Sequence, residues 1–301
     1  MNKSVKKFRL AVAAGMTVIR PYIYGTQVRK KKARLKRDKT FVTEVDNLSR
    51  KAARQVLLFF KKRGYELTAE DGKGIKCQKS TRRLLLDGLD GTYGFMIFLP
   101  TCTVILAIYD KAKQEIVGCF VGEPSTGQIW WAYGGSPCFR ERYDYNSEKF
   151  VEKTKVHVWK GALSRKSAIF LDISHEFKRR GKGTQVTTGP QMARLFANLN
   201  RKSKILIPGS NGLIHALTAN GGEGVAGGIT TAMGGEWDAC GLYLVLRAGG
   251  FLRAFRKNKN GTLTECNPLN PYEYDMLVFG NGKNTVNALI QALLASFKAT
   301  S

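Results

Sequence analysis

The chain has 301 residues, of which 43% are hydrophobic, enough to bury the core of one large domain or of two lobes. Its apolar runs, such as 95–100 and 103–109, are too short to cross a bilayer, which takes about 20 apolar residues, so we expect no membrane span. The six cysteines form no C-x-x-C pair and no Cys/His cluster, which argues against a zinc site or a dense disulfide framework and favours reduced thiols in the cytoplasm.

The net charge is +26, from 49 Lys and Arg against 23 Asp and Glu. Such a field attracts anions, whether phosphorylated small molecules or the backbone of a nucleic acid. A solvated basic surface with no partner would have the same composition. The charge therefore favours anionic ligands without choosing between them.

The first 65 residues indicate two helices separated by a basic loop. Apolar residues between Leu10 and Tyr22 have the spacing of a core-facing helix, although the acid-free, basic start of the chain also resembles a transit peptide. We expect a core helix. The stretch 29–39 holds eight Lys or Arg and is expected to be an exposed loop. A second helix begins at Asp46 as its N-cap and stops at Gly64.

The rest of the chain indicates strands, and later strands that alternate with helices. The first strands form an antiparallel meander and are expected at 83–86, 103–109, 116–122 and 128–133. The later strands are expected at 168–171, 204–208, 224–229, 251–255 and 276–280, with helices from about Gln191, Ser210, Asp238 and Thr285. We therefore predict an α+β lobe at 1–150 and an α/β lobe at 151–301, which form one catalytic unit.

One apolar strand runs directly into two aspartates, Asp87 and Asp90, and each of them is followed by a glycine. The glycines permit the tight turn that would bring both carboxylates and an intervening carbonyl toward one point. Mg²⁺ prefers oxygen ligands of this kind and completes its shell with water and substrate phosphate. A surface turn stabilised by aspartate would show the same short motif, so the motif alone does not decide.

Three further acids stand at intervals that give the motif a context: Asp46, Glu70, and Asp238 after Trp237. The order V-T-x-x-D, Glu-Asp, D-G-L-D-G-T, W-D and then A-G-G resembles the inositol monophosphatase superfamily of Mg²⁺-dependent, lithium-sensitive phosphatases. The resemblance covers nearly the whole chain. It implies a layered αβαβα sandwich of the sugar phosphatase type with two lobes.

The resemblance also implies the metal ligands. Glu70, Asp87 and the carbonyl of Leu89 would hold one Mg²⁺. Asp87, Asp90 and Asp238 would hold a second, and Glu70 with water a weaker third. Metal-activated water would then displace the leaving group in line, without a covalent enzyme intermediate.

The catalytic and substrate-binding roles follow from the same resemblance. Thr92, hydrogen-bonded to Asp46, would orient the attacking water, and Glu70 would take part through its metal. The amides of Gly91 and Thr92 would bind phosphate oxygens. Thr231 stands where inositol monophosphatases have a glutamate that grips inositol hydroxyls, so inositol is not expected to be the main substrate.

Two further departures from the family pattern concern the metal ligands. Gly88 replaces the usual proline, which should loosen the turn and reduce activity, because proline fixes φ and glycine does not. The helix after Trp237 is one residue shorter than usual, which makes the register of Asp238 less secure. His157, His175 and His215 have no spacing typical of a metal site or a catalytic triad, and we interpret them as structural.

The predicted function is Mg²⁺-dependent hydrolysis of a small inositol-phosphate or sugar-phosphate monoester. An alternative follows from residues 90–95, D-G-T-Y-G-F, which resemble the D-G-T-K-G-F of 3′(2′),5′-bisphosphate nucleotidases except for Tyr93. An alternative of another class is a degenerate relative that binds nucleic acid, which the charge of +26 and the basic stretch 29–39 suggest but do not favour. A purely structural protein is disfavoured because so many candidate ligands are present. By analogy with the family we expect a homodimer.

Overall fold

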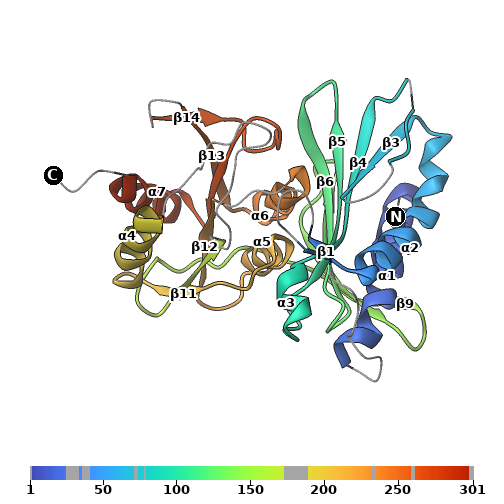
Figure 1. Ribbon diagram of the computed structural model, residues 1–301, viewed down its shortest axis with the longest axis horizontal. Coiled ribbons are helices and arrows are strands. Elements are labelled where there is room, and N and C mark those ends of the chain that lie inside the picture. Colours follow the sequence, from blue (N-terminus) through green and yellow to red (C-terminus); the bar gives the residue numbers. More distant parts are fainter. Residues whose placement is uncertain are drawn as a thin grey trace.

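The computed structural model describes residues 2–24, 34–35, 41–70, 74–77, 79–172, 189–231, 235–258 and 262–297. The described elements stack in five layers, two sheets separated and flanked by helices (Figure 1). This confirms the predicted αβαβα sandwich. Most of the expected basic loop at 29–39 lies outside the described residues. Two of its residues form the short strand β1 (Arg34–Leu35), which pairs with β2 (Phe41–Val42).

The first sheet has seven strands in sequence order: β3 (Tyr65–Ala69), β4 (Arg82–Asp90), β5 (Thr103–Asp110), β6 (Glu115–Gly122), β7 (Gln128–Tyr133), β8 (Phe139–Asp144) and β9 (Lys149–Lys155). β3 is parallel to β4, and every later pair is antiparallel, as the predicted meander requires. The strands expected from the sequence did not include β3, β8 or β9 of this sheet. The physical reason is clearest for β9. Its side chains are mostly exposed on the edge of the sheet, so they lack the apolar alternation by which a strand is identified.

Helices α1 (Lys3–Tyr24) and α2 (Glu44–Lys61) cover the outer face of this sheet. The rings of Phe8 on α1 and Phe60 on α2 stack with centroids 4.3 Å apart, which confirms the first helix as part of the core. The sequence suggested Asp46 as the N-cap of α2, but this prediction is wrong. The cap is Thr43, whose side chain accepts from the backbone of Asp46 while the Asp46 carboxylate accepts from the backbone of Thr43.

The second sheet has six strands in the order β11 (Lys204–Leu206), β10 (Ala168–Asp172), β12 (Val225–Thr230), β15 (Met276–Gly280), β13 (Phe251–Lys257) and β14 (Leu263–Cys266). The first three are mutually parallel, and the last three join antiparallel. Helices α4 (Gly189–Asn200) and α7 (Lys283–Phe297) cover its outer face. Because β10 and β12 are parallel, their carboxyl ends, at Asp172 and Thr230, lie side by side at the same end of the sheet.

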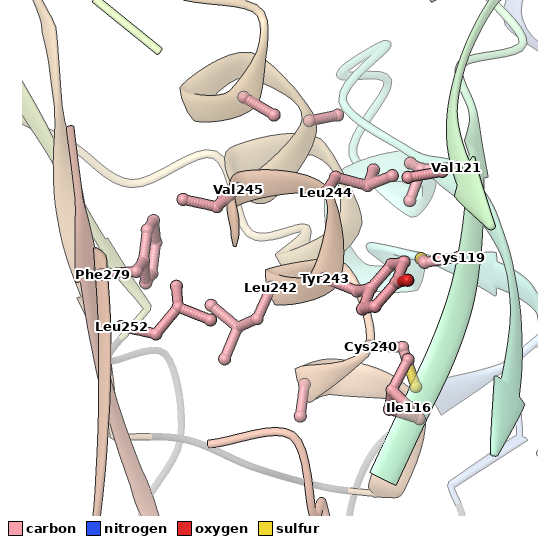
Figure 2. Packing of buried hydrophobic residues seen from close by; sticks show 14 of the residues in the cluster. Ile116, Cys119, Val121, Cys240, Leu242, Tyr243, Leu244, Val245, Leu252 and Phe279 are labelled. Atoms are coloured by element: carbon pink, nitrogen blue, oxygen red, sulfur yellow. The ribbon is translucent and has the colours of Figure 1, made fainter. Parts of the chain in front are cut away.

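Two short helices, α5 (Asn211–Ala219) and α6 (Leu242–Arg247), fill the space between the sheets. Figure 2 shows α6 with Leu244 toward Val121 of β6 and Val245 toward Phe279 of β15. The apolar cluster around these helices contains residues from both sheets, and its burial stabilises their association. No helix among the described residues combines the length and apolar character needed to cross a membrane.

Candidate active site

The site is built on the end of β4, a strand buried without interruption from Leu84 to Asp90. The exposed fractions of Asp87 and Asp90 are 3% and 6%. Gly91 follows with φ of +86°, and the short helix α3 (Thr92–Met96) begins there. A Cβ at Gly91 would lie 2.7 Å from the carbonyl oxygen of Thr101, so both the conformation and the space require glycine.

Asp90 is held by four hydrogen-bond donors from two parts of the molecule. Its Oδ2 accepts from the hydroxyls of Thr103 at 2.8 Å and Ser210 at 2.6 Å, and from the backbone nitrogen of Gly212 at 2.8 Å. Its Oδ1 accepts only a longer bond, 3.3 Å, from the nitrogen of Asn211. Thr103 belongs to β5, and the other three lie at the start of α5. Asp90 therefore ties the first sheet to the middle layer, with Oδ1 the less occupied oxygen.

Glu70, Asp87 and Asp238 form the other side of the site. The backbone nitrogen of Glu70 donates to the carbonyl of Leu86 at 3.0 Å, which places Glu70 beside the end of β4. Burial first, and then repulsion by Glu70 and Asp90, raise the pKa of Asp87 well above its ordinary range. Asp238, in the 3₁₀ turn η1 (Glu236–Ala239), has its pKa raised in the same way by burial, Glu70 and Asp90.

The charge environment of these acids differs from that of the chain as a whole. The strongest charge interactions on Asp87 and Asp238 are with other carboxylates, in a protein that has 49 basic residues. Burial also raises the pKa of Asp90, but its hydrogen-bond donors oppose that shift. A bound cation would lower the energy of this cluster more than of any single acid.

As they stand, no three acidic, His or Cys side chains within the described ranges are arranged to hold a metal ion. Two carboxylates are engaged elsewhere, Asp90 with α5 and Asp238 with the backbone nitrogen of Gly235 at 2.7 Å. The donor chemistry nevertheless fits Mg²⁺, since buried, mutually repelling carboxylates are the oxygen ligands that this ion takes.

Asp46 on α2 and Thr92 at the start of α3 are 46 residues apart in the sequence but lie next to each other in the structure. The Thr92 hydroxyl lies 3.3 Å from Oδ1 of Asp46 and 2.9 Å from the carbonyl oxygen of Leu89. The other oxygen of Asp46 accepts from the nitrogen and the hydroxyl of Thr43, at 2.7 and 2.6 Å. The capping box of α2 thus fixes the carboxylate that faces Thr92.

The other predicted residues lie as follows. Thr231 is buried beyond the end of β12. Its nitrogen donates to the carbonyl of Asp172, and its hydroxyl faces the sulfur of Met192 at 3.9 Å. His157 is exposed, and His175 lies outside the described residues. His215 is fully buried on α5 against Phe279, and burial lowers its pKa to about 3.

Sequence reasoning missed Asp172, which is buried at the end of β10 and repels Asp238. A signal was present, because Asp172 ends an apolar run in the same way that Asp87 does. Gly88 also differs from expectation. A Cβ there would lie 2.9 Å from the backbone nitrogen of Arg50, so the turn is packed against α2 and is not loose.

Comparisons with known proteins agree with this architecture. The crystal structure of the extragenic suppressor protein SuhB from Bartonella henselae superposes with a TM-score of 0.75 and 21% identity, covering 97% of this chain and 98% of that one. The inositol monophosphatase (IMPase) of Thermotoga maritima gives a TM-score of 0.68 at 20% identity, with 97% of each chain covered. At such identities the likeness shows the fold alone.

Sequence comparison adds the family. An inositol-1-monophosphatase of Rhizobium meliloti (strain 1021) is 27% identical over 113 residues, which are 38% of this chain and 41% of that protein. The profile of the inositol monophosphatase family matches residues 1–295. The match spans the N-terminal helices, the turn at the end of β4 (residues 87–92, hereafter the β4 turn) and the Trp237-Asp238 pair alike. This chain belongs to the inositol monophosphatase family.

Proposed function

We propose that the protein hydrolyses a small phosphate monoester in a Mg²⁺-dependent reaction with water as the nucleophile. The observation that carries the proposal is the group of buried carboxylates around the β4 turn, whose strongest charge interactions are repulsive. Bound Mg²⁺ would neutralise the phosphoryl group and acidify the attacking water. Family membership supports a phosphatase, and this charge arrangement supports the metal.

In this proposal Glu70, Asp87 and the carbonyl of Leu89 hold one ion. Asp87, Asp90 and Asp238 hold the second, and Glu70 also contributes to a weaker third. Asp90 would contribute through Oδ1, because its Oδ2 already accepts three hydrogen bonds. The Leu89 carbonyl, which would be a ligand of the first ion, accepts a hydrogen bond from the Thr92 hydroxyl in the structure.

Thr92 and Asp46 orient the water. When the Thr92 hydroxyl donates to Asp46, its oxygen is left to accept a hydrogen bond from the nucleophile. Asp46 keeps its direction because Thr43 occupies its other oxygen. The amides of Gly91 and Thr92, at the start of α3, bind the phosphate oxygens. A rigid acceptor thus sets the direction from which water approaches phosphorus.

The substrate class we propose is an inositol phosphate or a sugar phosphate. Thr231 supplies no carboxylate to grip ring hydroxyls, and its hydroxyl faces Met192, so selectivity for inositol is expected to be weak. Its role in substrate binding stays a prediction, as do a homodimer and a cytoplasmic location.

Phosphate release from inositol 1-phosphate, fructose 1,6-bisphosphate and adenosine 3′,5′-bisphosphate, each assayed with Mg²⁺ and with EDTA, tests the proposal. We expect release from at least one ester with Mg²⁺ and none with EDTA. Preference for the adenosine compound would favour the nucleotidase alternative. No Mg²⁺-stimulated release, together with salt-sensitive binding to a duplex that survives Asp90→Asn, would favour a basic nucleic-acid-binding protein.

A further inference from the structure

Ser49 touches the centre of the β4 turn although it belongs to another element. It lies on α2 one turn after Asp46, and its side chain is fully buried. Its hydroxyl donates a hydrogen bond of 2.6 Å to the carbonyl oxygen of Gly88. Gly88 stands between Asp87 and Leu89, which supply two of the proposed metal ligands. A helix that lies behind the acids thus holds the peptide between them.

The bonded peptide also acts on the carboxylate of Asp87. The carbonyl of Gly88 and the N–H of Leu89 belong to one planar peptide unit. Ser49 holds the oxygen of that unit, and the N–H at its other side donates to Oδ1 of Asp87 at 2.9 Å. Any rotation of the peptide plane would therefore change the direction of the Asp87 carboxylate.

Close packing keeps Ser49 in reach of the turn. A Cβ on Gly88 would lie 2.9 Å from the nitrogen of Arg50 and 3.0 Å from the carbonyl oxygen of Asp46, so the backbone of α2 nearly touches the turn. On the opposite side, a Cβ on Gly15 of α1 would lie 2.8 Å from the Ser49 hydroxyl oxygen. Since φ of Gly88 is not in the left-handed region, this glycine supplies space for the helix.

We infer that Ser49 is a positioning residue for the metal ligands: its hydrogen bond fixes the Gly88–Leu89 peptide and through it the Asp87 carboxylate. The rigidity that the family pattern obtains from a proline ring at position 88 is supplied here by α2. The inference rests on the proposed function, because it concerns the ligands of the proposed metal. Ser49 touches no reacting atom and acts only through its neighbours.

A matched pair of variants of the full chain tests this role. Ser296 on α7 is a control, because its hydroxyl is also buried and donates to a backbone carbonyl, that of Leu293, at 2.6 Å. The probe is Mn²⁺ alone, titrated calorimetrically. We expect Ser49→Ala to weaken Mn²⁺ binding about tenfold, as a lost outer contact typically does, and Ser296→Ala to change it less than about twofold. Equal Mn²⁺ affinity in both variants would overturn the inference.

Hydrogen exchange of the metal-free protein separates this inference from the proposed function. Peptides that contain residues 84–92 should exchange faster in Ser49→Ala and at the wild-type rate in Ser296→Ala, because only the first loses the bond to the turn. Unchanged exchange in Ser49→Ala would overturn the positioning role whatever the protein catalyses. Faster exchange in a protein whose wild type neither binds Mn²⁺ nor hydrolyses any ester would instead overturn the proposed function.

A second variant covers the case in which Ser49→Ala does not fold. Gly88→Ala keeps the serine but pushes the backbone of α2 away from the turn, and it should also weaken Mn²⁺ binding. Gly282→Ala is its control, since a Cβ there meets nothing within 4 Å. If Gly88→Ala bound Mn²⁺ with wild-type affinity, this would count against the inference as directly as wild-type affinity in Ser49→Ala.

Discussion

Asp87 and Asp90 are three residues apart on one turn and are both buried, yet their surroundings are opposite. Asp90 faces the start of α5, from which one hydroxyl and two backbone nitrogens donate to it, and the hydroxyl of Thr103 on β5 donates as well. Asp87 accepts from the nitrogen of Leu89, and its strongest charge interactions are with Glu70 and Asp90. Four donors offset much of the cost of burying Asp90, whereas Asp87 has one backbone donor and repelling neighbours, so a bound cation would compensate its charge.

The largest effect is expected from Asp90→Asn. An amide at this position cannot accept from all the donors that face it, so the free energy of unfolding should fall by about 1–3 kcal/mol. Turnover should fall by about 1000-fold or more, because an interaction with a catalytic metal is worth several kcal/mol. Urea unfolding in EDTA measures the change in stability, and phosphate release in Mg²⁺ measures the change in turnover. Unchanged stability would contradict the role of Asp90 as the tie between sheet and helix.

Asp87→Asn should lose turnover just as completely but change stability in the opposite direction. The raised pKa of Asp87 means that its carboxyl favours the folded state below an unfolded pKa of 3.8, and that this advantage is lost as pH rises through the folded pKa. At pH 8 in EDTA the neutral amide should therefore raise the free energy of unfolding by about 1 kcal/mol or more.

Two conditions check the sign for Asp87→Asn. The gain should shrink toward pH 4, where the wild-type carboxyl is protonated. It should also reverse in millimolar Mg²⁺, because only the wild type is stabilised by metal binding. A variant less stable than wild type at pH 8 without metal would show that Asp87, like Asp90, is held by donors.

The smallest effect is expected from His215→Leu, which alters α5 away from the end that holds Asp90. Neither ring nitrogen of His215 has a hydrogen-bond partner among the described residues. At pH 7 the leucine variant should therefore have a free energy of unfolding equal to that of the wild type or up to about 1 kcal/mol higher. The imidazole has a pKa of 6.5 when unfolded and about 3 when folded. The unfolded state therefore takes up a proton between these values, and wild-type stability falls as pH falls.

The measurement is the difference in unfolding free energy between His215→Leu and wild type at several pH values. Below pH 6.5 it should widen by up to about 1.4 kcal/mol per pH unit. The Mg²⁺ concentration for half-maximal turnover should not change. A shift in that concentration would mean that the packing of α5 and the grip of its first turn on Asp90 are coupled.

Much of the fold could be predicted because its signals are local. Apolar periodicity identified α1, α2 and the strands of the meander, and the buried run before Asp87 indicated the turn. Exposed edge strands such as β9 carry no such periodicity. The cap of α2 was placed three residues late because both Thr43 and Asp46 have side chains that cap, and only their reciprocal bonds decide between them.

The acids of the site could be named from the order of motifs along the chain, but the groups that hold them could not. Thr103 and Ser210 lie 13 and 120 residues from Asp90, and nothing in their own surroundings in the sequence marks them as its donors. For Gly88 the sequence supported the wrong inference, because a glycine was taken to indicate a conformationally flexible turn. Only the position of α2 shows that its backbone occupies the space that a side chain at position 88 would need.

The contact between Gly88 and α2 also constrains how this sequence can change. A proline introduced at position 88 would have its ring where the backbone of Asp46 and Arg50 now lies, so it requires the helix to move first. The helix in turn is held by Ser49 against both Gly88 and Gly15. The three positions are therefore epistatic, and a route back to the family's proline must pass through α2 and α1 before it reaches the turn.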